Sequence, residues 1–142
     1  MRLYVLVMAV AVAGCSTSTA TMQVEGDPIA RVALAAEQAA GWAVTERSAG
    51  AVEVREIWPA HSVVMLGVSA FYAELRHDPP ELVARFYLQS SGLMTLGLPQ
   101  RIDVEDGVYG AALKPRLRES AVQVLDWAGV RPADRPAFLR FQ

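Results

Sequence analysis

Cysteine and histidine are scarce in this 142-residue chain, and their scarcity limits its chemistry. Cys15 is the only cysteine, so the chain cannot form the internal disulfides that small domains in oxidising compartments commonly use. The two histidines, His61 and His77, are not at helical ligand spacing, and neither adjoins a cysteine or another histidine. We therefore expect no metal site, and a fold that packing alone stabilises.

Motifs that hold cofactors or activate nucleophiles are also missing. The sequence has no glycine-rich phosphate loop, CxxC pair, dinucleotide fingerprint or G-x-S-x-G elbow. The acidic run at residues 103–107 has glycine at its fifth position, whereas a calcium loop needs glycine at its sixth, so the run is typical of a solvated turn. The sequence predicts no cofactor and no enzyme. A hydrolase would need His61 or His77 beside a serine and a carboxylate in a cleft.

Basic residues do not outnumber acidic ones. The 13 lysines and arginines face 15 aspartates and glutamates, giving a formal charge of −2. This balance offers no basic footprint for nucleic acid, which we exclude as a partner, and no electrostatic attraction to anionic lipid. With 53% hydrophobic residues, the chain has enough apolar side chains for one small folded domain.

The longest apolar run lies at the start of the chain. Arg2 precedes an uninterrupted apolar stretch at residues 3–13, and the small residues Ala13 and Gly14 follow its core. This pattern is typical of a secretory signal peptide. The stretch is shorter than the roughly 20 residues that a membrane-spanning helix needs, and polar residues follow it. We therefore expect residues 1–14 to be a cleaved signal peptide.

The end of this leader, Val12-Ala13-Gly14-Cys15, resembles the lipobox of bacterial lipoproteins. The resemblance implies that diacylglycerol is attached to the Cys15 thiol, that the leader is then removed, and that the new amino terminus is often acylated. Several acyl chains hold a protein firmly on a membrane, at about 0.8 kcal/mol per buried methylene. Ser16, in place of aspartate, implies by the same resemblance the periplasmic face of an outer membrane. An ordinary secretory signal that happens to contain a cysteine is the alternative.

The mature chain begins with a hydroxyl-rich segment. Residues 15–26 comprise the lipidated cysteine and a stretch without periodicity, which we expect to be a flexible tether. Asp27 and Pro28 then form a helix start, and Gly41 a helix stop. The apolar face of this first helix consists of Ile29, Val32, Ala33, Ala36 and Ala40.

Strand patterns follow the first helix. Residues 42–46 and 51–58 are β-rich and separated by a turn, which predicts a hairpin with one buried face. Residues 63–68 are nearly continuously apolar, as in a central strand. Phe71, Ala73 and Leu75 alternate with polar or aromatic residues, which predicts a fourth strand.

The segment after Asp78 admits two interpretations. Asp78-Pro79-Pro80-Glu81 matches a helix start, and Leu82, Val83, Phe86 and Tyr87 then form an apolar stripe, so we predict a helix. The competing interpretation is a strand with its even-numbered apolar residues inward. We expect residues 90–98 to form a loop or an irregular strand.

The C-terminal part contains a second helix and a tail. A helix is predicted after Lys114-Pro115, ending at Gly129; its apolar face consists of Leu117, Ala121, Val124, Leu125 and Ala128. We expect a small domain at residues 27–130 and an arginine-, proline- and aromatic-rich tail without regular structure at residues 131–142, with Phe138, Leu139 and Phe141 folded back on the core.

The order of these elements also resembles a family of small uncharacterised proteobacterial lipoproteins. In that family a Gly-Trp pair ends the first helix, a glycine turns the first hairpin and a histidine opens the next strand. Gly41-Trp42, Gly50 and His61 stand at matching places. The family's closing Tyr-Asn-x-Trp helix corresponds here to Tyr109-Gly110 with no following tryptophan. The resemblance implies helices packed on a short antiparallel sheet.

These observations predict an α+β fold: a helix, a three- to four-stranded antiparallel sheet, and one or two helices packed on one face. The predicted function is that of a membrane-anchored envelope lipoprotein that binds a protein partner or aids an assembly. The candidate partner contacts are Leu93, Met94, Leu96, Leu98, Phe138 and Phe141. If buried, the first four belong to the core, and the tail aromatics alternatively belong to a solvated chain end. A small-ligand or lipid carrier is the other function considered, with Met65, Leu66, Phe86 and Met94 lining an apolar cavity.

Overall fold

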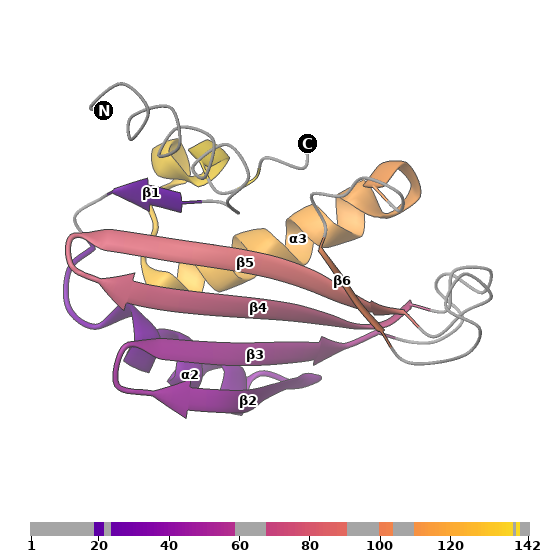
Figure 1. The fold of residues 1–142 in the computed structure, drawn as a ribbon, viewed down its shortest axis with the longest axis horizontal. Coiled ribbons are helices and arrows are strands. Elements are labelled where there is room, and N and C mark those ends of the chain that lie inside the picture. The colour runs from indigo at the N-terminus through magenta and orange to yellow at the C-terminus, as the bar shows by residue number, and fades with distance from the viewer. Residues whose placement is uncertain are drawn as a thin grey trace, which may run out of the picture.

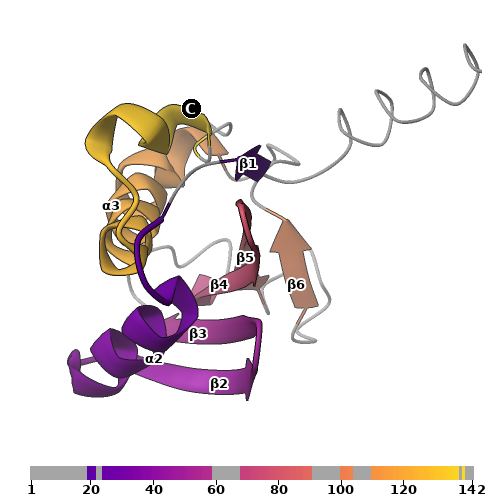
Figure 2. The same cartoon turned by 90° about the vertical axis from the view of Figure 1, so that its left-hand side faces the viewer.

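The computed structural model describes residues 19–21, 24–58, 68–90, 100–103, 110–137 and 139. Its elements are β1 (Thr19–Thr21), α2 (Pro28–Gln38), β2 (Trp42–Ser48), β3 (Ala51–Ile57), β4 (Val68–Asp78), β5 (Glu81–Ser90), β6 (Gln100–Asp103), α3 (Gly110–Ala128) and the 3₁₀ helix η4 (Pro132–Ala137). The predicted α+β class is confirmed: four long antiparallel strands, β2 to β5, form a sheet with helices packed on one face (Figures 1 and 2).

The four long strands form a meander, and two short strands share one edge of it. The order across the sheet is β1-β5-β4-β3-β2. β1 pairs with the first three residues of β5, and β6 pairs with residues 87–90 at the other end of the same strand. Every pairing is antiparallel. Among the described strands, β5 therefore carries two short neighbours on its outer side, and β2 forms the opposite edge.

The first helix and hairpin agree with the sequence pattern. An Asp27 carboxylate oxygen accepts hydrogen bonds from the backbone N–H groups of Ile29 (3.1 Å) and Ala30 (3.2 Å), which caps α2. Gly41, with φ of +83°, follows the helix in the left-handed region. Four of the five predicted face residues are at most 2% exposed: Ile29, Val32, Ala33 and Ala36. Small alanines let α2 lie close to the sheet.

β5 corrects the prediction of a helix after Asp78. Residues 81–90 form a strand, and Leu82, Ala84, Phe86 and Leu88 are at most 2% exposed on the helix-covered face. Asp78 and Glu81 face each other across a tight turn between β4 and β5. A strand forms instead of a helix because the backbone groups of this segment pair with β4 along its whole length. Side chains of a strand alternate between its two faces, so an apolar side chain is buried at every second position.

α3 starts earlier than predicted, at Gly110, so that Pro115 lies inside the helix. The preceding alanines and leucine are good helix formers, and they outweigh the single intrahelical hydrogen bond that Pro115, the sixth residue of the helix, cannot donate. The predicted apolar face is confirmed by the buried residues Leu117, Ala121, Val124, Leu125 and Ala128. Gly129, with φ of +84°, ends the helix as expected.

Both chain ends carry more structure than predicted. Residues 19–21, expected to lie in a flexible tether, form β1, and Val24 packs against the core. Strand addition to β5 supplies the hydrogen-bond partners that a polar segment cannot find alone. The tail forms η4 at residues 132–137, and Leu139 is buried, as expected. The predicted strand at 63–68 and loop at 90–98 lie outside the described residues except for Val68 and Ser90, which belong to β4 and β5.

The core lies between the helices and the sheet and is rich in aromatic contacts. Phe71 of β4 stacks on Trp58 and on Phe86, with ring centroids 6.0 and 5.8 Å apart. Trp42 meets Phe71 edge-on at 6.1 Å and Trp127 of α3 at 4.9 Å. Such geometries add about 0.5–1.5 kcal/mol per pair beyond burial. Phe86, expected to line an apolar cavity in a carrier, fills this core; Met65, Leu66 and Met94 lie outside the described residues.

Candidate functional site

The site residues predicted from the sequence fall almost entirely outside the described part of the chain. The predicted site residues outside it are Cys15, His61 and the six proposed partner contacts Leu93, Met94, Leu96, Leu98, Phe138 and Phe141. His77 lies in β4, partly buried, and its backbone N–H donates to the Gly50 carbonyl at 2.8 Å. The described residues include no group of three or more histidine, cysteine or acidic side chains placed to hold a metal ion.

The face of the sheet away from the helices carries a polar network centred on Glu53 of β3. Glu53 is only 5% exposed. Both of its carboxylate oxygens accept hydrogen bonds from the Arg101 guanidinium of β6, each at 2.8 Å, and the Thr45 hydroxyl of β2 donates a third at 2.9 Å. This two-point pairing is the strong geometry for arginine and a carboxylate. It joins β6 to β3 across the two intervening strands, β5 and β4.

Aromatic and amide side chains of the intervening strands support the Arg101 side chain. Its guanidinium carbon lies 4.1 Å from the centre of the Tyr72 ring of β4, within cation–π range. The Tyr72 hydroxyl in turn donates to the Gln89 amide oxygen of β5 at 2.9 Å. Residues from β2, β3, β4, β5 and β6 therefore hold one ion pair in a fixed geometry.

The ion pair keeps Glu53 charged. The hydrogen bonds from Arg101 hold the pKa of the Glu53 carboxyl below its ordinary value, and they outweigh the opposing effect of burial; the Thr45 hydroxyl acts in the same direction. The bonds to Glu53 also raise the pKa of Arg101. A carboxylate whose pKa is lowered in this way is a weak proton acceptor.

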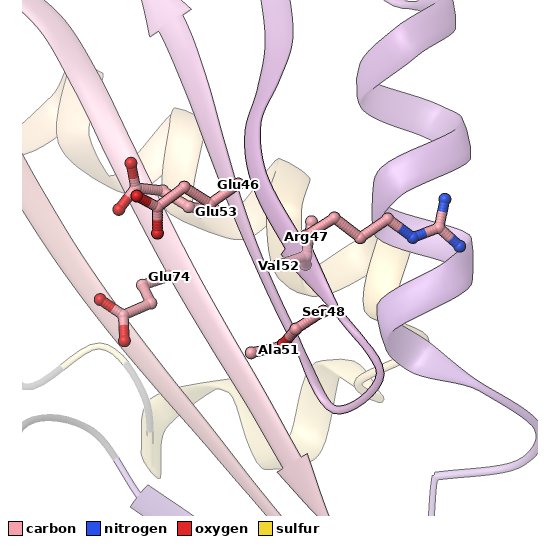
Figure 3. A pocket seen from close by; sticks show the side chains of 7 residues that line it. All are labelled: Glu46, Arg47, Ser48, Ala51, Val52, Glu53 and Glu74. Carbon is pink, nitrogen blue, oxygen red and sulfur yellow. The ribbon is translucent and has the colours of Figure 1, made fainter.

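Glu53 is the middle of three glutamates in one row across the sheet. Glu46 of β2 pairs in register with Glu53, which pairs in register with Glu74 of β4. Figure 3 shows the three carboxylates on the same side of the sheet, with Arg47 pointing to the other. The row lines an open depression of about 380 Å³, together with Arg47, Ser48, Ala51 and Val52. Like charges directly opposite each other generally destabilise a sheet, and the pairing of Glu53 with Arg101 reduces that repulsion here.

Arg101 neutralises only one of these three charges. Glu46 is exposed, and the Glu74 side chain is 33% exposed with its carboxylate 3.9 Å from the Arg76 guanidinium. An ion pair of this length at the surface is weak. The row therefore presents negative charge to the solvent beside an open depression, in a form that a lysine or arginine of another molecule can approach.

A second buried carboxylate, Glu56 of β3, lies on the opposite, helix-covered face. It is 4% exposed and accepts hydrogen bonds from Trp58 Nε1 (2.8 Å), from the Ser120 hydroxyl (3.2 Å) and from Arg116. The last two residues belong to α3. All the partners are internal to the described fold, so the arrangement fixes α3 on the sheet.

Only a partial signal for the glutamate row is present in the sequence. Glu53 and Glu74 occupy polar positions in predicted strands whose apolar and polar residues alternate. Neither this alternation nor their spacing in the chain shows that they lie opposite each other. Arg101 has no local pattern at all, because it meets Glu53 from 48 residues away in the chain. Only the register between strands brings these side chains together.

Comparison with known proteins assigns no family to this chain. The sequence matches no family profile, and neither a curated protein nor a solved structure matches the chain. Within the described residues, no helix has both the length and the hydrophobicity needed to cross a bilayer.

Proposed function

We propose that this chain is a lipid-anchored envelope lipoprotein, on the periplasmic face of the outer membrane, that binds a protein partner rather than catalysing a reaction. The anchor rests on the likeness of Val12-Ala13-Gly14-Cys15 to a lipobox, with Cys15 as the lipidated residue. The binding surface is the glutamate row formed by Glu46, Glu53 and Glu74 with its depression.

The observation that supports binding is the negative charge that Arg101 leaves at the two ends of the row. Arg101 compensates Glu53, while Glu46 is exposed and Glu74 has only a weak surface ion pair with Arg76. A cationic group from a partner that approaches Glu46 or Glu74 gains charge-assisted hydrogen bonds. The partner surface is therefore expected to present lysine or arginine.

Residues 93–98 and the tail aromatics remain proposed contacts for the same partner. Leu98 lies two residues before Gln100, the first residue of β6, and β6 is held over the outer face by Arg101. Apolar residues together with a charged row match the usual composition of interfaces, an apolar centre with a polar rim.

Intact-protein mass spectrometry of the membrane fraction tests the anchor. Wild-type protein is expected to show the mass of the chain from residue 15 with acyl groups attached. The Cys15→Ala variant is expected to accumulate as unprocessed precursor. An unlipidated, soluble wild-type product would contradict the anchor.

Quantitative affinity capture from solubilised envelopes tests the binding surface. The Glu46→Gln/Glu74→Gln double variant is expected to reduce recovery of a specific partner at least about tenfold, the effect of some 1.4 kcal/mol. Glu37→Gln, an exposed glutamate on α2, makes the same chemical change on the helix side and is expected to leave recovery unchanged. Equal recovery by all three proteins, or recovery that does not fall with added salt, would contradict the proposal.

A further inference from the structure

The length of chain between the lipid anchor and the fold limits how far the domain can move from its membrane. Residues 16–18 are the only residues between Cys15 and Thr19, where β1 begins. A fully extended chain spans at most about 3.6 Å per residue, so the Thr19 and Cys15 Cα atoms lie within about 14 Å of each other. A tether of this length cannot lift a folded domain clear of a bilayer surface.

Together with this limit, the place of β1 at one edge of the sheet indicates which edge faces the membrane. Thr19 pairs with Val83, Val83 with Arg76, Arg76 with Ala51, and Ala51 with Ser48, so one row of register crosses the sheet from β1 to β2. Neighbouring strands are about 4.8 Å apart, so the four steps of this row cover about 19 Å along the sheet. β1 is the strand nearest the anchor, and β2 is the farthest.

We infer that the domain lies against a lipid surface with the β1 edge of its sheet, and holds its β2–β3 hairpin away from that surface. In both views η4 lies at the same end of the molecule as β1, so this end faces the lipid (Figures 1 and 2). The glutamate row begins at Glu46 on β2, at the far edge, where the negative charge meets the aqueous compartment. The inference rests on the proposed lipidation of Cys15 and adds an orientation to it.

Fluorescence quenching on vesicles measures this orientation. Because Cys15 is consumed by lipid, a cysteine introduced at an exposed position is the only free thiol and takes a single fluorophore. The labelled sites are Glu81→Cys, opposite Thr21 of β1, Arg76→Cys on β4 and Ser48→Cys on β2. The acylated proteins are placed in phosphatidylethanolamine–phosphatidylglycerol vesicles that carry nitroxide on the lipid headgroups.

Quenching is expected to decrease from position 81 to 76 to 48, with at least a twofold difference between the first and the last. A Gly-Ser linker of about twelve residues inserted between Ser18 and Thr19 is expected to reduce this difference, because a flexible chain of that length spans about 19 Å on average. Equal quenching at the three sites in acylated protein, or a difference that the linker leaves unchanged, would overturn the orientation alone. Absence of the acyl mass in the same samples would instead overturn the proposed lipoprotein.

Discussion

Two glycines with the same backbone conformation have different surroundings. Gly41 and Gly129 both have φ near +84°, a region that costs other residues about 1–2 kcal/mol. A Cβ on Gly41 would have no atom within 4 Å, whereas one on Gly129 would lie 2.8 Å from Nη2 of Arg31. That nitrogen donates to the Ala128 carbonyl at 2.7 Å, and so joins α2 to the end of α3.

Gly129→Ala is therefore expected to destabilise the fold more than Gly41→Ala. Both variants lose about 1–2 kcal/mol from backbone strain. Gly129→Ala also displaces Arg31, which costs about 1 kcal/mol more through the lost hydrogen bond. Urea unfolding of both variants measures the difference. In an Arg31→Ala background the two glycine substitutions are expected to cost the same, and a persistent difference there would contradict this explanation.

The Glu53–Arg101 pair makes stability depend on pH in a defined direction. The pKa of Glu53 is lowered in the folded state, chiefly by Arg101, so the carboxylate's contribution is complete above its ordinary pKa of 4.5 and is lost as the pH falls through the lower folded-state value. Arg101→Ala is expected to reduce the free energy of unfolding by about 2 kcal/mol at pH 7 and by progressively less below pH 4.5. Urea unfolding at pH 7 and at pH 3 measures both values.

Arg118→Ala is the matched control for that experiment. Arg118 is an exposed arginine on α3, so its removal changes the net charge equally without touching Glu53. Its effect on unfolding is expected to stay within about 0.5 kcal/mol at both pH values. A loss for Arg101→Ala that did not shrink at low pH would show that the arginine acts through packing on Tyr72 instead of through the carboxylate.

At the scale of the elements, Glu56 connects β3 to α3. It accepts hydrogen bonds from Ser120 and Arg116 of α3 while its own strand lies in the sheet. Removing one partner of a buried, charged network typically costs about 3–5 kcal/mol. Since the Arg116 side chain is 43% exposed, the lower part of this range applies.

Glu56→Ala is thus expected to destabilise the protein by about 3 kcal/mol, and Ser120→Ala by about 1 kcal/mol, since serine loses a single hydroxyl donor. Thermal unfolding followed by circular dichroism measures both. Glu37→Ala, an exposed glutamate on α2, serves as control with a change below about 0.5 kcal/mol. A Glu56 variant as stable as that control would mean that apolar packing alone holds α3 in place.

At the scale of the whole molecule, β4 is the most protected strand. It pairs with β3 over residues 70–76 and with β5 over its full length, and most of its side chains are buried. β2 pairs only with β3 among the described residues, and residues 45–48 of it are exposed. Amides in β4 are expected to exchange with solvent deuterium orders of magnitude more slowly than those on the free side of β2.

Hydrogen–deuterium exchange with peptide-level mass spectrometry checks this ranking in the isolated protein. Protection of β2 equal to that of β4 would mean that the free edge of β2 is covered, and would contradict the ranking. Repeating the measurement with a captured partner is expected to slow exchange in β2 and β3 first, because they carry Glu46 and Glu53.

The sequence by itself determined the elements that have clear capping residues and a clear spacing of apolar residues. Asp27-Pro28 and Gly41 bound α2, and the helical spacing of Leu117, Ala121 and Val124 identified the buried face of α3. The hairpin of β2 and β3 followed from alternation around a turn. Capping and periodicity act between residues a few positions apart, so a sequence displays them directly. The lipobox pattern at Cys15 is local in the same sense and stays a prediction.

Tertiary structure decided what depends on distant partners. The even-numbered apolar residues of β5 fit a strand only because β4 pairs with them, and residues 19–21 become a strand only because β5 has a free edge beside them. The ion pair of Glu53 and Arg101 joins residues 48 positions apart. Register between strands is a property of the assembled sheet, since shifting it by one residue moves every side chain to the opposite face. For that reason the sequence determined the fold class, and the structure alone placed the glutamate row.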